Sequence, residues 1–286
     1  MTTTYNSIKS LREALKPLRS DKKIALVPTM GNLHQGHISL VKLAKQHADI
    51  VVVSIFVNPT QFGVGEDLDS YPRTLEADTE KLIEAEADYI FAPTVDEMYP
   101  IMPPPTQVLA GSISQMLCGK SRPTHFDGVG IVVTKLFNIV QPDVAIFGKK
   151  DYQQLAIIKQ LVRDLSFDIQ LIGGPIVRAE DGLALSSRNQ YFTETERAAA
   201  PALHKAVLDL AVKLQSGRAT SETTLQSLIE ESITAINAKG FKVDYLEVRN
   251  QDLTPITEFA GKQSWVIAVA AWLGKARLLD NQEVDI

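Results

Sequence analysis

The sequence has a single cysteine, no apolar run long enough to cross a bilayer, and no excess of positive charge. One cysteine cannot form an intramolecular disulfide, so we expect a reducing compartment, the cytoplasm. The segment around Cys118, residues 115–119, favours a small packed side chain over a nucleophile. The longest apolar runs, 50–57 and 265–273, fall well short of the roughly 20 residues that a transmembrane helix needs. Both are predicted to be buried strands.

The charge balance narrows the possible partners. The formal net charge is -5 and the sequence pI is about 5.6. Nucleic acids are held mainly by clustered Lys and Arg, so a mildly acidic chain is not expected to bind them, although a small anionic ligand needs only a few local donors. Residues 1–10 are polar and lack the apolar segment of a signal peptide. Neither a nucleic acid nor a membrane is therefore an expected partner.

The first part of the chain alternates short apolar runs with segments of helical periodicity. This alternation predicts a parallel sheet with helices on both faces, in a Rossmann-like, doubly wound α/β layout. In such sheets, ligands bind beyond the carboxyl ends of the strands. Strands are expected over 23–27, 50–57, 88–91, 144–147 and 168–172, and helices over 36–46, 74–87, 128–140 and 151–165.

The pattern changes near residue 176. Two helices are followed by three strands, which predicts a smaller C-terminal α+β domain with an antiparallel sheet. The join, 173–182, is rich in Gly, Pro and Asp, as a hinge would be. We therefore predict domains over 1–176 and 177–286. The second domain has expected helices over 193–215 and 221–239 and expected strands over 241–248, 264–271 and 276–279.

The densest chemical signal is the turn PTMGNLHQGH at 28–37, between the first strand and the first helix. Gly31 and Gly36 are spaced as in a P-loop, but His37 and Ile38 replace the Lys-Ser/Thr pair, so this is not a Walker A motif. A helix N-terminus offers N–H groups to phosphate, and His34 and His37 can add two donors. The alternatives are a zinc-binding pair or a plain turn with surface histidines.

Three further polar segments follow predicted strands or the hinge. Asn58 and Gln61 offer amides that suit a small hydroxylated acid, although Asn-Pro is also a common turn. Residues 147–154 place Lys150 at a strand end, where it can reach a phosphate or remain solvated on an ordinary capped helix. Residues 185–189 carry two hydroxyls and a guanidinium, which suit a closing phosphate clamp or a polar turn.

The His-x-Gly-His pattern in a strand–turn–helix setting is similar to the signature of the nucleotidylyltransferase superfamily. Together the segments, in order and over essentially the whole chain, resemble the pantoate–β-alanine ligase family of that superfamily. The blocks that carry this resemblance are PTMGNLHQGH (28–37), FVNPTQFG (56–63), YPRT (71–74), HFDGV (125–129), KKDYQQL (149–155), DGLALSSRN (181–189) and AAWLGKARLLDN (270–281).

The resemblance implies a two-step ligase reaction. The carboxylate of pantoate attacks the α-phosphate of ATP to give pantoyl adenylate and pyrophosphate, and the amine of β-alanine then displaces AMP to give pantothenate. Such chemistry needs charge stabilisation and positioning more than a nucleophilic side chain. The resemblance also implies Mg²⁺, held largely by phosphate oxygens, and a homodimer. Asp78 could contribute to Mg²⁺ binding, but a carboxylate on a helix face is more often solvated, so no protein metal ligand is assigned.

Carried over by position, the resemblance assigns each site residue a role. His37, His34, Lys150 and Arg188 are expected to be catalytic, with His37 as the proton donor. Asn58, Gln61 and Gln154 are expected to bind substrate, with Gln61 also near the β-alanine site. The family usually has Gly-Glu-Lys-Asp where this chain has Lys149, which leaves the role of that position open. The expected ATP site comprises Met30, Gly31, Asn32, Leu33, His34, Gln35, Gly36, His37, Gly148, Lys149, Lys150, Asp151, Val177, Leu185, Ser186, Ser187 and Arg188.

Two other functions use the same motifs. A nucleotidylyltransferase that stops at a nucleotidylated product would share the histidine turn but would need no amine site. A non-catalytic nucleotide-binding regulator would not need His34, His37, Lys150 and Arg188 together. Pyrophosphate release separates the three, because the ligase requires pantoate, the transferase requires another acceptor, and the regulator releases none.

Overall fold

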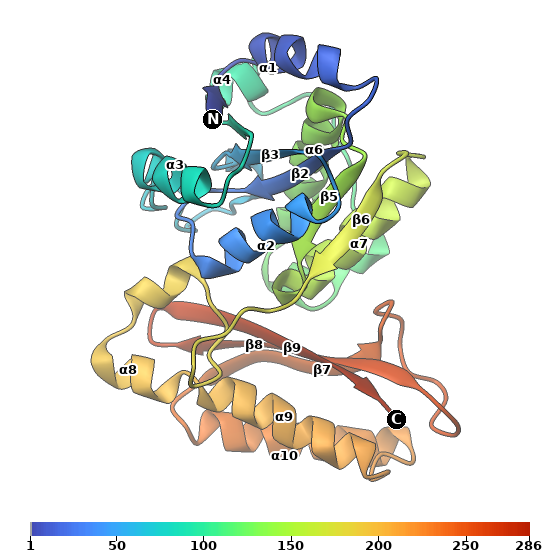
Figure 1. The fold of residues 1–286 in the computed structure, drawn as a ribbon. Helices are drawn as coiled ribbons and strands as arrows, with labels where there is room; N and C mark the ends of the chain where they lie inside the picture. Colours follow the sequence, from blue (N-terminus) through green and yellow to red (C-terminus); the bar gives the residue numbers. More distant parts are fainter. Residues whose placement is uncertain (1) are drawn as a thin grey trace. The chain divides into compact units, whose positions relative to one another are not determined.

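The computed structural model describes residues 2–286 and divides them into two compact units (Figure 1). The first comprises the chain up to Lys149 together with Ile157–Pro175. The second comprises Lys150–Ala156 together with Ile176–Ile286. Residues 150–156 thus group with the second unit, whereas the sequence had placed them in a first domain that runs to 176.

The first unit is built on a six-stranded parallel sheet with strand order β1-β4-β3-β2-β5-β6. Its central strands are apolar and β-branched, as strands covered on both faces require. The predicted Rossmann-like parallel sheet is confirmed, and β1 is an addition that its polar sequence did not reveal. The strands are β1 (Thr3–Tyr5), β2 (Ile24–Thr29), β3 (Ile50–Ile55), β4 (Tyr89–Phe91), β5 (Val144–Gly148) and β6 (Gln170–Gly174).

Helices cover both faces of this sheet (Figure 1). Alternate residues of β5 show the division: Val144 and Ile146 join a core cluster with α2 (Gln35–Lys45) and α3 (Leu75–Glu84). Phe147 instead meets Phe137 of α6, with ring centroids 6.4 Å apart. The remaining helices that begin in this part of the chain are α1 (Ile8–Leu15), α4 (Val95–Met98), α5 (Cys118–Ser121), α6 (His125–Val140) and α7 (Tyr152–Asp164), and the 3-10 turns are η1 (Lys16–Leu18), η2 (Pro59–Gln61), η3 (Ser112–Gln115) and η4 (Lys149–Asp151).

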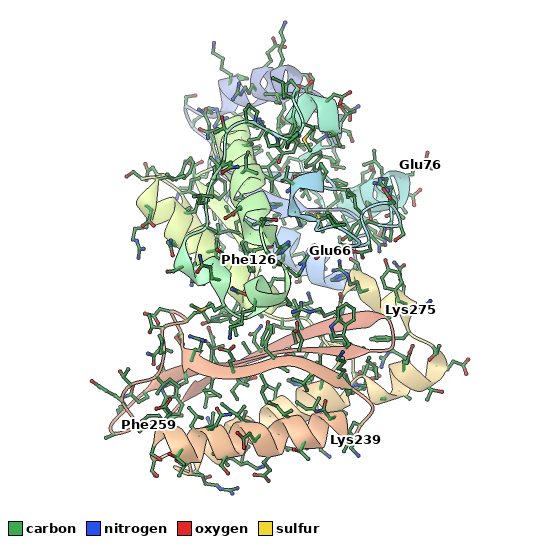
Figure 2. All side chains as sticks on the ribbon, turned by 180° about the vertical axis from the view of Figure 1, so that it is seen from behind. Glu66, Glu76, Phe126, Lys239, Phe259 and Lys275 are labelled. Atoms are coloured by element: carbon green, nitrogen blue, oxygen red, sulfur yellow. The ribbon has the colours of Figure 1, made fainter. Side chains whose placement is uncertain are left out.

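The second unit is an antiparallel sheet of order β7-β8-β9 with α9 and α10 on one face. Phe259 lies in the loop between β7 and β8 (Figure 2) and packs edge-on against the buried Trp265. The predicted smaller α+β fold of this part of the chain is confirmed. Its elements are η5 (Ser187–Tyr191), α8 (Glu194–Ala199), α9 (Ala202–Gln215), α10 (Glu222–Asn237), β7 (Lys242–Asn250), β8 (Ser264–Leu273) and β9 (Ala276–Asp285).

Two predicted elements of the second unit were wrong in extent. The single helix expected over 193–215 is two helices, because Pro201 has no N–H to continue the hydrogen-bond ladder. The strand expected over 276–279 runs on through Asp285, since its polar residues pair with β8. Within residues 2–286, no helix has the length and apolar character to cross a membrane.

Candidate active site

The histidine turn joins β2 to α2 through two residues with left-handed backbone. Gly31 has φ 82° and Asn32 has φ 50°. A Cβ at Gly31 would lie 3.1 Å from Asp78 Oδ2 and from a methyl carbon of Ile55, so glycine also allows the close approach of α3. The sequence PTMGNLHQGH therefore folds into a tight turn that delivers His34 to the N-cap of α2.

Both histidines of the turn bind the backbone of the helix that they begin. Gly36 N donates to His34 Nδ1 at 3.1 Å, and His34 N donates to His37 Nδ1 at 3.2 Å. The two ring centroids are 4.1 Å apart. Since each Nδ1 accepts, the neutral form of each ring carries its proton on Nε2. The turn thus presents two adjacent imidazole N–H donors beside a helix N-terminus.

Asp78 of α3 holds the turn in place. Its side chain accepts from Asn32 N at 2.8 Å, from Leu33 N at 2.7 Å and from Thr74 Oγ1 at 3.0 Å. Asp78 is 0% exposed, so the expectation of a solvated helix-face carboxylate was wrong. The nearby Lys81 Nζ donates to Leu33 O at 2.7 Å. Helix α3 therefore fixes the backbone just before His34 with two charged side chains.

Asn58 and Gln61 lie together beyond β3, in and beside η2. Asn58 Nδ2 donates to Gln61 Oε1 and to Gly128 O, both at 3.0 Å. Asn58 Oδ1 accepts from Thr60 Oγ1 and from Tyr99 OH, both at 2.9 Å. Asn58 is 1% exposed, so its amide is committed to protein contacts. Gln61 Nε2 contacts Met30 Sδ at 3.1 Å, which places Gln61 beside the histidine turn.

A hydrogen-bond network that the sequence did not predict holds the backbone of Gln61. His125 Nδ1 donates to Gln61 O at 2.7 Å, and Arg122 Nη1 donates to His125 Nε2 at 3.0 Å. Arg122 also makes a bidentate pair with Glu66, at 2.6 and 2.7 Å. The Arg122 hydrogen bond is the main reason why the pKa of Glu66 lies below its usual value. Gly128 of α6 permits this arrangement, because a Cβ there would lie 2.1 Å from Thr60 O.

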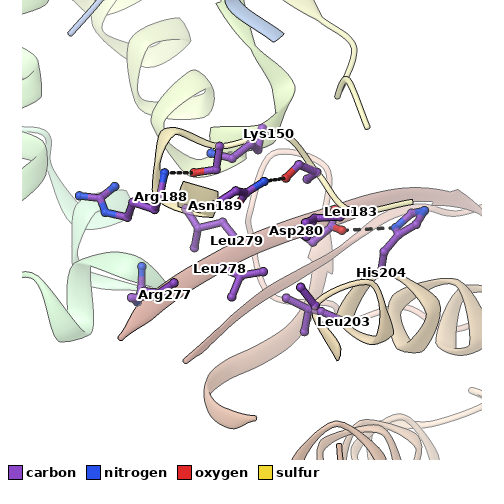
Figure 3. Close-up of a pocket in the computed structure, with 14 residues that line it drawn as sticks. Lys150, Leu183, Arg188, Asn189, Leu203, His204, Arg277, Leu278, Leu279 and Asp280 are labelled. Atoms are coloured by element: carbon purple, nitrogen blue, oxygen red, sulfur yellow. Dashed lines mark hydrogen bonds and ion pairs between the residues drawn. The ribbon is translucent and has the colours of Figure 1, made fainter. Parts of the chain in front are cut away.

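In the second unit, Lys150 and Arg188 line one pocket (Figure 3). The two residues come from segments far apart in the sequence, so the fold brings together two cations that we predicted to contact phosphate. Lys150 Nζ lies 3.3 Å from Asp151 Oδ2. Ser186 Oγ accepts from Arg188 N at 3.3 Å. The pocket is lined by Lys150, Leu183, Ala184, Ser186, Arg188, Asn189, Ala200, Leu203, His204, Ala276, Arg277, Leu278, Leu279 and Asp280.

The segment that carries Arg188 begins as a short hairpin. Leu185 N donates to Val177 O at 2.9 Å, and Ala179 N donates to Leu183 O at 2.8 Å. The predicted adenine contact, Val177, is therefore hydrogen-bonded to Leu185, the first residue of the predicted phosphate clamp. Ser187 opens the 3-10 turn η5, which continues to Tyr191.

The predicted site residues divide between the two units. Met30 to His37, Asn58, Gln61, Gly148 and Lys149 belong to the first, whereas Lys150, Asp151, Gln154, Val177 and Leu185 to Arg188 belong to the second. Each unit thus assembles a polar cluster of its own. Four further residues around the second cluster, Arg178, His204, Asp280 and Asn281, were not predicted individually, although the last two end the sequence block 270–281.

Comparison with known proteins assigns the family. The profile of the Pantoate-beta-alanine ligase family matches residues 3–283. The chain belongs to the pantoate-beta-alanine ligase family. This result confirms the resemblance inferred from the sequence blocks and the predicted ligase class.

Relatives within this family match along essentially their full length. A pantothenate synthetase from Psychrobacter sp. (strain PRwf-1) is 76% identical over 285 residues, covering 100% of both chains. The crystal structure of pantoate-beta-alanine ligase from Thermus thermophilus is 43% identical with a TM-score of 0.87, covering 98% of both chains. The Francisella tularensis ligase, complexed with beta-gamma ATP and beta-alanine, is 35% identical with a TM-score of 0.81, covering 99% of this chain and 97% of that one.

Proposed function

We propose that this ligase joins pantoate to β-alanine through a pantoyl adenylate. The observation that carries the proposal is that Lys150 and Arg188 line the same pocket, in a chain that matches the family over residues 3–283. A pair of cations suits a triphosphate, whose charge must be held while the α-phosphate is attacked. The Francisella tularensis relative, solved with beta-gamma ATP and beta-alanine, supports both substrates.

In the first step, a pantoate carboxylate oxygen forms a bond to the α-phosphorus of ATP while the bond to the bridging oxygen of the β-phosphate breaks, and pyrophosphate leaves. His34 and His37 donate from Nε2 to phosphate oxygens, because their Nδ1 atoms already accept backbone N–H groups. His37 donates its Nε2–H as a hydrogen bond to the departing pyrophosphate. Lys150 and Arg188 offset the negative charge that develops on the phosphates.

In the second step, the uncharged β-alanine amine attacks the acyl carbon of the adenylate, the acyl carbon–oxygen bond breaks, AMP leaves, and the nitrogen loses a proton to water. Gln61 and Gln154 hold pantoate, and Gln61 also lies near the incoming amine. The amide of Asn58 makes hydrogen bonds within the protein, which supports an indirect role at the substrate site. We assign it to the positioning of Gln61.

The residues proposed to bind ATP are those that the resemblance assigns. They are Met30 to His37, Gly148, Lys149, Asp151, Val177 and Leu185 to Arg188. Asp151 beside Lys150 suits a ribose hydroxyl, and the backbone of Val177 suits adenine. Lys149, which replaces the Glu usual in the family, adds positive charge beside Lys150.

Mg²⁺ enters this scheme with ATP, as part of the substrate. Among residues 2–286, no group of three or more His, Cys, Asp or Glu side chains could hold a metal ion. Asp78 already accepts three hydrogen bonds and is fully buried, so it does not suit direct metal ligation. The ion is therefore proposed to be held by phosphate oxygens and water.

We also propose that the enzyme is a cytoplasmic homodimer. The family resemblance supports the dimer, and the single cysteine, Cys118, which is buried, supports a reducing compartment. Light scattering of the purified protein tests the assembly: a mass close to twice the 31.4 kDa of one chain is expected, and a mass of one chain at micromolar concentration would contradict it.

The test of the reaction is the release of pyrophosphate and AMP from ATP and Mg²⁺. With pantoate alone, we expect a single turnover of pyrophosphate as the adenylate accumulates on the enzyme. Adding β-alanine should start steady production of AMP and pantothenate. Pyrophosphate that needs another acceptor would indicate a nucleotidylyltransferase, and no release from protein that still binds ATP would indicate a regulator.

A further inference from the structure

Strand β9 carries two adjacent buried polar residues, Asp280 and Asn281, which are 4% and 5% exposed. They close the sequence block 270–281, to which the proposed chemistry gives no task. Neighbouring residues on a strand point to opposite faces of the sheet. Two buried polar side chains in succession therefore engage different surroundings, and their partners show what each does.

Asp280 anchors the hairpin that leads to Arg188. Arg178 donates to both carboxylate oxygens of Asp280, each at 2.7 Å. His204 Nδ1 lies 3.3 Å from Asp280 Oδ2 (Figure 3). Arg178 Nη1 also donates to Gly182 O at 3.1 Å. Burial by itself would raise the pKa of Asp280, but the contacts with His204 and Arg178 outweigh it and lower that pKa. The carboxylate is therefore held charged against the base of the hairpin.

The hairpin transmits this anchor to the predicted phosphate clamp. Arg178 and Ala184 form a β-bridge, and Leu185 N is bonded to Val177 O. Asn189 Nδ2 donates to Ala184 O at 3.1 Å, which ties the far side of the clamp to the same hairpin. The β-bridge and hydrogen bonds of the hairpin therefore link the segment that carries Arg188 to the side chain of Asp280.

Asn281 performs the matching task for the other cation. Its Nδ2 donates to the backbone carbonyl of Lys150 at 2.9 Å. Asn281 N in turn donates to Asp280 Oδ1 at 2.7 Å, so the two residues are coupled through their own backbone. One dipeptide of β9 therefore fixes two segments that are distant in the sequence and that both reach the pocket in Figure 3.

We propose that Asp280 and Asn281 are positioning residues that set Arg188 and Lys150 in register for the triphosphate. This inference rests on the proposed function, in which both cations contact phosphate. A buried ion pair such as Arg178–Asp280 contributes little net stability over apolar residues of the same size. Its value lies in fixed geometry, and a displacement of about 1 Å at a reacting group can cost about a hundredfold in rate.

Double-mutant cycles test the proposal by pyrophosphate release, scored as kcat/KM for ATP. Asp280→Asn is expected to lower this value by about tenfold or more in the natural enzyme, but by about twofold or less when Arg188→Ala is already present. Asn281→Ala should behave in the same way with Lys150→Ala. Arg178→Lys, which keeps the charge but loses the bidentate fork, should reproduce Asp280→Asn and serves if the latter does not fold.

Two variants in the same sheet provide matched controls. Glu247→Gln weakens an ion pair in which two nitrogens of Arg249 contact Glu247 Oε2, at 2.6 and 2.7 Å, and Asn250→Ala removes an amide that donates to the carbonyl of Pro255 at 3.0 Å. Each is expected to lower stability without a large effect on kcat/KM, and to combine additively with Arg188→Ala. Their thermal midpoints calibrate the structural part of the effect.

The outcomes separate the proposal from the function on which it rests. Losses that stay additive in both cycles, while Lys150→Ala and Arg188→Ala are each defective, would overturn the positioning role and leave the proposed site intact. Full activity of Lys150→Ala and Arg188→Ala would instead remove both cations from the mechanism, and the positioning role with them. Coupling in both cycles with additive controls is the expected result.

Discussion

Replacing Asp78 by Asn tests whether the histidine turn depends on a buried carboxylate. Asp78 accepts from the consecutive backbone N–H groups of Asn32 and Leu33, at 2.8 and 2.7 Å. An amide of the same size can accept one of these with its oxygen, but its NH₂ group then faces the other N–H. The change therefore removes a charge-assisted hydrogen bond and leaves a buried donor unpaired.

The magnitude follows from these two losses. A hydrogen bond to a charged group contributes about 1.5–3 kcal/mol, and an unpaired buried donor costs about 1–3 kcal/mol. Partial relaxation of the turn reduces the sum, and we expect a loss of about 3 kcal/mol in the free energy of unfolding. For a unit of this size, each kcal/mol lowers the thermal midpoint by about 2–4 °C, which gives a fall of about 6–12 °C.

The assay pairs thermal unfolding of the ligand-free protein, followed by circular dichroism, with the rate of pyrophosphate release. Asp49→Asn is the control, because Asp49 also accepts a backbone N–H, from Lys23 at 2.9 Å, but does so at an exposed position next to the start of β2. Asp78→Asn should lower both the midpoint and the rate. Equal midpoints for the two variants, with an unchanged rate, would refute the anchoring role of Asp78.

Three further predictions follow from single contacts. His37→Ala should cut pyrophosphate formation by about a hundredfold or more, while the midpoint falls only as far as the loss of one cap, about 1 kcal/mol; a folded and fully active variant would remove His37 from the mechanism. The pKa of Glu66 is lower in the folded protein, so its contribution to stability is present above the unfolded pKa of 4.5 and is lost as pH falls through the folded pKa. Glu66→Gln should therefore make the urea midpoint fall less steeply as pH is lowered. An unchanged dependence of the urea midpoint on acidic pH would contradict this. Gly182→Ala should lower the thermal midpoint more than Gly240→Ala. Both glycines have positive φ, but only a Cβ at 182 would contact His204, at 3.1 Å. Equal thermal midpoints would show that the His204 side chain moves aside at no cost.

The sequence predicted the elements that follow one local period and missed those that depend on distant partners. The apolar run 50–57 contains β3, and the spacing in 36–46 matches α2 to within a residue. β1 was not predicted because Thr3–Tyr5 is polar and forms a strand only by pairing with β4. The helix expected over 193–215 was wrong because its apolar period continues across Pro201, where the hydrogen-bond ladder cannot.

The site shows the same limit. Motifs located His34, His37, Lys150 and Arg188, since each follows a strand or the hinge, but they carried no information on what holds them. Asp78 looks like a solvated residue in a charged helix, and only the three-dimensional structure reveals its burial. The contact between Arg178 and Asp280 joins residues 102 positions apart, so no local sequence pattern could predict it.

The hydrogen bond between Asn281 and the carbonyl of Lys150 has a consequence for synthesis of the chain. The two residues are 131 positions apart, and the ribosome adds about 5–20 residues per second, so Lys150 precedes its partner by roughly 7–26 s. Throughout that interval residues 150–156 have no β9 to join. A fragment that starts at Ile176 would lack them altogether. The second unit therefore gains these β9 contacts only after Asn281 has been made, and removing residues 280–285 should deprive the pocket of part of its lining without shortening the first unit.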